Sequence, residues 1–445
     1  MNHPVRESAG KNVFMKKILF SATLIIICIF AIVSCKKKSR DPLVIVDSII
    51  VPKLNPEVTS PVINVYLENS GSMDGYVNGN TGFKQFIYYY LSELQGKKVA
   101  SSINLSYINS KIIPRGSDVK SFIHNTNPST FKAGGGNLDT SDIAVVLDTL
   151  LSHRKNGEVS LFISDCIVSP GKAYSSLSPA NINSYLLQQR TDMTTIFRRE
   201  LNRDKDLTVV ICQLQSYFDG KFFNRIDQWR KYQGERPFYF WLIGNARQIK
   251  SIMDKIPWSD FKGKGAEIEN LYILTSPAQQ VKYAIVNADC WGSFEREHFH
   301  SADASRTICK VKKESKGKNV GKFKFSIGVD FGSFPLDCDY LQNPDNYEID
   351  NKDYTLEIKE TNQGNFSHRL GLITNIISPC QITVSLKNKF PDWVNEKTDF
   401  IGQDLVADKA ENKTYGLNYL VEGVYKAFVD AKSSDDYARL TVTIK

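Results

Sequence analysis

Carboxylate and hydroxyl side chains gather directly after an apolar run in the stretch VYLENSGSMDGYV, near the start of the chain. Glu68 ends the run, and Ser70 and Ser72 follow it two residues apart. Oxygen groups of this kind are the ligands that Mg²⁺, Mn²⁺ and Ca²⁺ prefer in proteins. The stretch therefore indicates part of a site for a hard divalent cation.

Two later segments carry side chains of the same chemistry. The stretch GGGNLDTSDI stands just before an apolar pattern of helical spacing and contains Asp139, Thr140 and Asp142. Asp165 directly follows another apolar run, VSLFIS. In a sheet of parallel strands flanked by helices, ligands bind beyond the carboxyl ends of the strands, where the strand order reverses. We expect the three segments to meet there.

The elements that would position these residues alternate between strand and helix over residues 61–276. Short apolar runs predict strands at 62–67, 103–108, 159–164, 207–214, 238–244 and 271–275. Helical spacing of apolar residues predicts helices over 83–94, 143–151, 182–197 and 246–256. The runs at 207–214 and 238–244 are almost uninterrupted, as in central parallel strands that helices cover on both faces. This order predicts an α/β fold with a doubly wound, mostly parallel sheet.

From about residue 277 the apolar pattern changes to a period of two. The alternation predicts half-buried antiparallel strands at 323–329, 354–358, 382–386 and 440–444. We therefore expect a β-rich, sandwich-like domain over residues 277–445. One helix, over 417–428, interrupts it, with Thr414 as its candidate cap. An early run at 43–51 is expected to pair with these strands, which would make the α/β domain an insertion.

The first 34 residues have the organisation of a secretory signal, with a basic start, a long apolar run and a small residue before Cys35. The segment IVSC resembles a bacterial lipobox, which implies lipidation of Cys35. Lysines and an arginine follow within residues 35–60, as in a basic tether beside anionic headgroups. An uncleaved membrane anchor is the alternative. We expect an exported protein that is held at a membrane of the bacterial cell envelope.

The composition of the 445 residues narrows the class of protein. With 42% hydrophobic and 11% aromatic residues, the chain can fill the cores of about two domains. The net charge of +8 is mild and lies partly in the tether. The sequence has no basic stripe with interleaved aromatic residues, so we do not expect it to bind nucleic acid. An exported compartment permits disulfides, but the spacing fixes no pairing and contains no CxxC zinc motif. The cysteines concerned are Cys166, Cys212, Cys290, Cys309, Cys338 and Cys380.

The three oxygen-rich segments resemble the metal-ion-dependent adhesion site of von Willebrand factor type A domains. That family has an Asp-x-Ser-x-Ser motif after its first strand, a Thr before a helix and an Asp after its fourth strand. ENSGSM matches the first motif except that Glu68 replaces Asp. The resemblance covers residues 61–276. It implies a cation held by Glu68, Ser70, Ser72, Thr140 and Asp165.

Two departures from the family pattern bear on the ion. Glu68 is longer than Asp by one methylene, and Mg²⁺ tolerates such a change of geometry less than Ca²⁺ does. The glycines of the second segment stand three residues before Thr140, which leaves Asp139 or Asp142 to replace or assist it. The alternative is that the serine hydroxyls only cap the turn after the strand, without an ion.

The resemblance implies binding rather than catalysis. In the family, a carboxylate of the partner often completes the coordination of the metal, so the expected ligand is an envelope or surface protein. Two alternatives stay open: a metal-dependent hydrolase of phosphate or ester substrates, since hard cations activate water, and a metal-free scaffold of an envelope assembly. The segments contain neither a G-x-S-x-G elbow nor a histidine base for a serine nucleophile.

Overall fold

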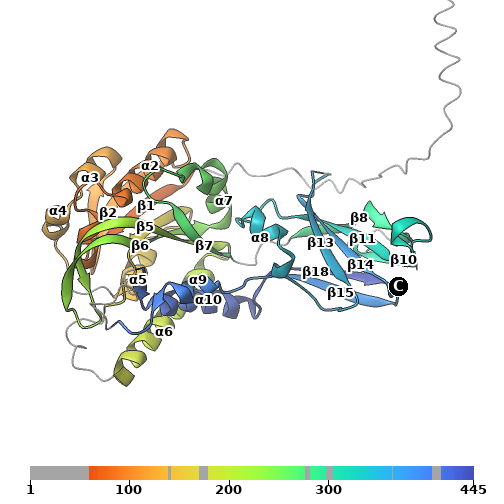
Figure 1. Cartoon of the computed structure of the whole chain (residues 1–445). Helices are drawn as coiled ribbons and strands as arrows, with labels where there is room; N and C mark the ends of the chain where they lie inside the picture. The colour runs from red at the N-terminus through yellow and green to blue at the C-terminus, as the bar shows by residue number, and fades with distance from the viewer. Residues whose placement is uncertain are drawn as a thin grey trace, which may run out of the picture. The chain divides into compact units, whose positions relative to one another are not determined.

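The computed structural model describes residues 60–138, 142–169, 179–275, 281–296, 304–362, 364–402 and 412–445 (Figure 1). The predicted signal, Cys35 and the early run at 43–51 lie outside this part of the chain. Within the described residues, no helix is long and apolar enough to cross a membrane.

A seven-stranded mixed sheet occupies the first half of the described chain, with the order β3-β2-β1-β4-β6-β5-β7. Its strands are β1 (Val62–Glu68), β2 (Ser102–Ile108), β3 (Ile112–Gly116), β4 (Glu158–Ser164), β5 (Leu207–Phe223), β6 (Trp229–Asn245) and β7 (Ile268–Thr275). β1 runs parallel to β2 and β4, whereas the pairs β2–β3, β4–β6, β6–β5 and β5–β7 are antiparallel. The predicted strands are present, but the expectation of a mostly parallel sheet is wrong.

The hairpin of β5 and β6 is the reason for this difference. Each strand has 17 residues, and they pair over their whole length from Leu207 with Asn245 to Phe223 with Trp229. A connection of only five residues, 224–228, joins them, and so short a connection permits only antiparallel neighbours. β6 therefore runs opposite to β4, although its apolar run has the composition of a central parallel strand.

Helices cover both faces of the sheet, because alternate side chains of its strands enter two separate cores (Figure 1). On one face, Ile63, Val65 and Leu67 of β1 pack with α2 (Gly82–Gly96), α3 (Val119–Asn125) and α7 (Ala246–Lys255). On the other face, Tyr66 packs with α5 (Ile143–His153) and α6 (Pro179–Arg203). Among the described residues of this half, the remaining short helices are η1 (Gly71–Tyr76), α4 (Pro128–Ala133) and η3 (Trp258–Phe261).

The C-terminal half contains two further sheets that share one core. The first has the order β12 (Tyr347–Ile349), β15 (Cys380–Lys387), β18 (Asp436–Ile444), β10 (Thr307–Lys312) and β9 (Ser293–Arg296). The second has the order β13 (Thr355–Glu360), β14 (His368–Thr374), β11 (Phe323–Asp330) and β8 (Lys282–Trp291). Phe325 and Leu370 of the second sheet lie in the same buried cluster as Val384 and Leu440 of the first. This half is therefore β-rich, with two layers of strands around one core.

Several short elements connect these sheets. They are η4 (Ala304–Arg306), η5 (Gly317–Asn319), α8 (Cys338–Gln342), η6 (Pro344–Asn346), α9 (Asp392–Glu396), β16 (Thr398–Asp399) and β17 (Thr414–Tyr415). The expected cap Thr414 belongs to β17, which pairs in parallel with β16.

The helix α10 (Leu417–Lys432) comes from the C-terminal half of the sequence but packs on α6 of the first half. Its N-cap is Gly416, which has the left-handed φ of 78° that favours glycine. Gly423 marks the closest approach of the two helices, because a Cβ there would lie 2.6 Å from the Arg190 carbonyl oxygen and 2.6 Å from the Met193 Cβ. The Thr194 hydroxyl also donates to the Gly423 carbonyl, at 3.0 Å.

We expect Gly423→Ala to lower the free energy of unfolding by about 1–3 kcal/mol, because the added methyl group has no room between two backbones. Gly96→Ala is the matched control, since Gly96 also lies in a helix but has open space where its Cβ would be. The control should be neutral or stabilising by up to about 1 kcal/mol. Urea denaturation of both variants measures the difference. Equal effects would show that the contact of α10 with α6 is not close.

Candidate functional site

The carboxyl ends of β1 and β4 bring two of the sequence-predicted segments together. The strands are parallel neighbours, and β2 flanks β1 on its other side, so the strand order reverses at this point. Glu68 is the last residue of β1, Ser70 follows it, and Asp165 comes directly after β4. All three are buried, with exposed fractions of 1%, 3% and 1%.

The two serine hydroxyls lie next to each other, with 3.0 Å between the Oγ atoms of Ser70 and Ser72. Ser70 stands at the N-cap of η1, but its side chain makes no capping hydrogen bond there. The Asp165 backbone N–H donates to the Met73 sulfur at 3.2 Å, which joins this turn to the end of β4. The arrangement leaves the hydroxyl of Ser70 directed at Ser72 and not at the start of the helix.

Glu68 fixes the end of β4. Its carboxylate accepts a hydrogen bond from the Ser164 hydroxyl, and the Ser164 oxygen in turn accepts from the Cys166 backbone N–H at 2.7 Å. Burial raises the pKa of the Cys166 thiol well above its ordinary value, and the charge of Glu68 raises it further. A thiol of this kind stays protonated at neutral pH and is a poor nucleophile.

Asp165 is the least satisfied group of the site. Its Oδ1 accepts from the Ile167 backbone N–H at 3.2 Å, but its buried Oδ2 accepts no hydrogen bond from any residue that the structure describes. Burial raises the pKa of Asp165, while Arg236 and, to a smaller extent, the Ile167 N–H and Ser72 act in the opposite direction. A buried carboxylate oxygen without a partner is costly, so it is the strongest candidate to contact a cation.

The second predicted segment approaches the same site. The Gly71 N–H donates to the Leu138 carbonyl at 3.0 Å, and Leu138 is the last described residue before Asp139 and Thr140, which lie outside the described chain. Asp142 caps α5, where its Oδ1 accepts from the Val145 N–H at 3.1 Å and its Oδ2 accepts from Gln189 at 3.2 Å.

Two buried asparagines hold these loops in place and were not identified from the sequence. The Asn109 amide donates to Asn69 at 3.0 Å and to the Gly135 carbonyl at 2.9 Å, and the Asn69 amide donates to the Phe131 carbonyl at 3.0 Å. Gly136 has a φ of 86°, and a Cβ on it would lie 2.0 Å from the Asn109 oxygen. The glycine run therefore lets the loop pack closely against Asn109. The only sequence signal for the buried asparagines was that Asn69 lies inside the ENSGSM motif.

The donor set fits a hard cation. Ser70 and Ser72 offer hydroxyls, and Asp165 offers a buried carboxylate oxygen that has no partner among the described residues. In the same part of the chain, no three side chains of the His, Cys, Asp or Glu type form a metal-binding group. The candidate site thus depends on serine hydroxyls as much as on carboxylates.

Comparisons of the chain with models of protein families, with curated proteins and with solved structures find no match. The likeness to von Willebrand factor type A domains rests on the motif residues and their order along the chain.

The raised pKa of Asp165 predicts how stability depends on pH in a chelator. A carboxyl whose pKa is higher in the folded state stabilises folding below its unfolded pKa of about 3.9 and loses this contribution as the pH rises through its folded pKa. We therefore expect Asp165→Asn to raise the unfolding midpoint at pH 7 and to lose that advantage toward pH 4. Thermal melts across this pH range measure the effect.

Asp118→Asn is the control, because hydrogen bonds from Ser121 lower the pKa of Asp118 and give the opposite pH dependence. A larger loss of stability in Asp165→Asn at pH 7 than at pH 4 would contradict the prediction. It would show that the charged carboxylate is stabilised as an ion pair with Arg236.

Proposed function

We propose that this chain is a membrane-anchored envelope lipoprotein whose type A-like α/β domain binds a protein partner through a divalent cation. The observation that carries the proposal is the buried Asp165 Oδ2, which has no hydrogen-bond partner in the described chain and lies at the sheet edge that also presents Ser70 and Ser72. A cation would give this buried oxygen the partner that it lacks. A carboxylate of the partner protein would then complete the coordination of the cation.

The residues have different expected roles. Ser70, Ser72 and Asp165 would contact the cation, with Thr140 completing the set as the family pattern implies. Glu68 accepts from Ser164, which suits a contact through water better than a direct one. When bound, the cation supplies an open coordination position for an acidic group of the ligand.

Binding is better supported than hydrolysis. Among the described histidines, His124 and His153 are exposed at the ends of α3 and α5, and His368 lies in β14 of the C-terminal half. None of them stands beside Asp165 as a general base for an attacking water. The nearby Cys166 thiol has a raised pKa and does not supply a nucleophile.

The cation itself gives the most direct test of this proposal. Mg²⁺, Mn²⁺ or Ca²⁺ at 100 times its dissociation constant should stabilise the fold by about 2.7 kcal/mol, since a ligand that binds only the folded state shifts the equilibrium by mass action. Ser70→Ala combined with Ser72→Ala should abolish the shift of the melting temperature. Ser121→Ala with Ser152→Ala, two exposed serines, should leave it intact. If none of the three cations shifts the melt of the unaltered chain, the metal proposal fails.

Exchanges at Glu68 separate its charge from its length. Glu68→Asp restores the shorter residue of the family motif, and we expect it to bind the cation several-fold more tightly. Glu68→Gln keeps the length and the hydrogen bond from Ser164 but removes the charge, so it should bind several-fold more weakly. Titration calorimetry with Mn²⁺ measures both. Affinities that do not differ between the two variants would remove Glu68 from the cation site.

A further inference from the structure

Lysines are concentrated in one short segment of the β-rich half, residues 310–322, which we call the lysine turn. It begins in β10, contains η5 and ends directly before β11 (Figure 1). Six lysines and one glutamate give this segment a net charge of +5, compared with +8 for the whole chain. All six lysines are exposed; they are Lys310, Lys312, Lys313, Lys316, Lys318 and Lys322.

The backbone holds these lysines close together. The Glu314 N–H donates to the Lys322 carbonyl at 2.7 Å, and the Gly321 N–H donates to the Glu314 carbonyl at 2.9 Å. Val311 packs against the core of this half and fixes the start of the turn. The fold thus gathers like charges, which repel one another and oppose folding unless a negative partner offsets them.

The single acidic residue of the turn is engaged by the backbone. The carboxylate of Glu314 accepts hydrogen bonds from the N–H groups of Gly292, Ser315 and Lys316, at 3.1, 2.9 and 3.2 Å. These bonds fix the loop and lower the pKa of Glu314. Its charge therefore serves the conformation of the turn and offsets only one of the six lysines.

Most of the lysines have no ion pair with the rest of the protein. Lys310 pairs with Glu295 at 2.8 Å. The other five exposed lysines form no ion pair with any residue that the structure describes. An apolar side chain stands among them, because Val320 lies between Lys318 and Lys322 and is 57% exposed.

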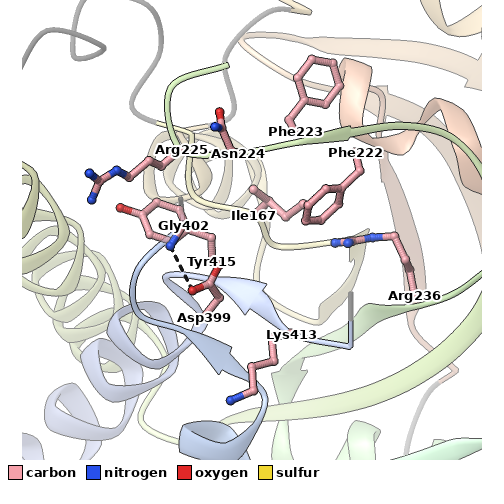
Figure 2. Close-up of a pocket in the computed structure, with 10 residues that line it drawn as sticks. All are labelled: Ile167, Phe222, Phe223, Asn224, Arg225, Arg236, Asp399, Gly402, Lys413 and Tyr415. Carbon is pink, nitrogen blue, oxygen red and sulfur yellow. Dashed lines mark hydrogen bonds between the residues drawn. The ribbon is translucent and has the colours of Figure 1, made fainter. Parts of the chain in front are cut away.

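The cations at the turn of the β5–β6 hairpin differ from these lysines. Figure 2 shows Arg225 and Arg236 in that region. The Nη1 of Arg225 donates to the Ile401 carbonyl at 3.2 Å. Arg236 is only 1% exposed, and its charge favours the ionised form of Asp165. Contacts within the protein account for these two arginines, whereas they do not account for the lysine turn.

We propose that the lysine turn binds the headgroups of anionic phospholipids at a membrane surface. Each lysine near such a surface raises the partition onto it by about fivefold. The exposed Val320 would enter the boundary between the headgroups and the acyl chains. The inference rests on the proposed function only in placing the chain at a membrane. It adds that the folded β-rich half contacts this membrane, in addition to the lipid anchor.

The composition of the turn favours a lipid surface over other anionic partners. It contains no aromatic residue and no arginine, which are the side chains on which the bases of nucleic acids stack. Lysine is also depleted at protein interfaces, where arginine and aromatic residues are enriched. Lysine ammonium groups are compact point charges on flexible stems, and they suit a surface of many negative headgroups without a fixed geometry.

Lysine footprinting on the full chain tests this inference. The chain is incorporated into vesicles of phosphatidylcholine alone or of phosphatidylcholine with phosphatidylglycerol, and is acetylated with N-hydroxysuccinimidyl acetate. Mass spectrometry then measures the rate at each lysine. We expect the anionic lipid to slow acetylation of the lysine turn by about threefold or more, and high salt to remove this protection. The rates of Lys120 and Lys262, exposed lysines of the α/β half, should change by less than about twofold because charges beyond a Debye length are screened.

A triple variant removes charge from the turn itself. Lys313→Gln combined with Lys316→Gln and Lys318→Gln should abolish the protection of Lys312 and Lys322, because too few charges remain to hold the turn at the headgroups. The melting temperature of this variant should stay unchanged or rise, since the lysines repel one another in the folded state.

The matched control changes the net charge equally but elsewhere. Lys120→Gln, Lys262→Gln and Lys352→Gln replace three exposed lysines outside the turn, and together they should leave the protection intact. Loss of protection in this control as well as in the first variant would overturn the inference. It would show that the charge of the whole chain, and not the turn, attracts the lipid.

Flotation of the same vesicles separates this inference from the proposed function. A chain that does not float with neutral vesicles contradicts the lipid anchor, while footprinting with anionic vesicles still decides the role of the turn. A chain that floats with both kinds of vesicle, but whose turn is acetylated equally fast in both, overturns the inference and leaves the anchor standing. Protection by a DNA duplex at the same ionic strength, without protection by the anionic vesicles, would also overturn it and assign the turn to nucleic acid.

Discussion

The candidate site depends on the burial of two opposite charges at one edge of the central sheet, neither of which has its full set of partners. Asp165 has one buried oxygen without a hydrogen bond, and Arg236 has one buried nitrogen without a hydrogen bond, among the described residues. Their charges affect each other, since Arg236 favours the ionised form of Asp165. Desolvation of both groups is nevertheless incompletely compensated, and such a cost is typical of sites that bind ligands.

The fold creates this situation through two features. The parallel pair of β1 and β4 brings Ser70, Ser72 and Asp165 to the same edge, and a hydrogen-bonded pair of asparagines, Asn69 and Asn109, fixes the loops above it. The long antiparallel hairpin of β5 and β6 then extends past that edge and carries Arg236, whose charge favours the ionised form of Asp165.

Much of this architecture could be predicted from the sequence. The spacing of apolar residues at 62–67, 143–151 and 159–164 indicates which side chains are buried, and therefore which segments form strands or helices. It did not predict the antiparallel course of 238–244, because a strand buried on both faces has the same composition in either direction. Ser70 and Asp165 were identified from their types and spacing, and the structure places both at the same edge. The burial of Arg236 near Asp165 could not be predicted, because it depends on segments that are distant in the sequence. A charged residue at the start of an apolar run does not indicate which residues will surround it.

We propose that the Asp165 oxygen that lacks a hydrogen-bond partner among the described residues belongs to a cation site. Anomalous diffraction from crystals of the chain soaked in Mn²⁺ tests it most directly. We expect a manganese peak within about 2.0–2.6 Å of Asp165 Oδ2 and of the hydroxyls of Ser70 and Ser72. A structure without manganese at this position, in which the Asp165 carboxylate instead pairs with Arg236, would contradict it.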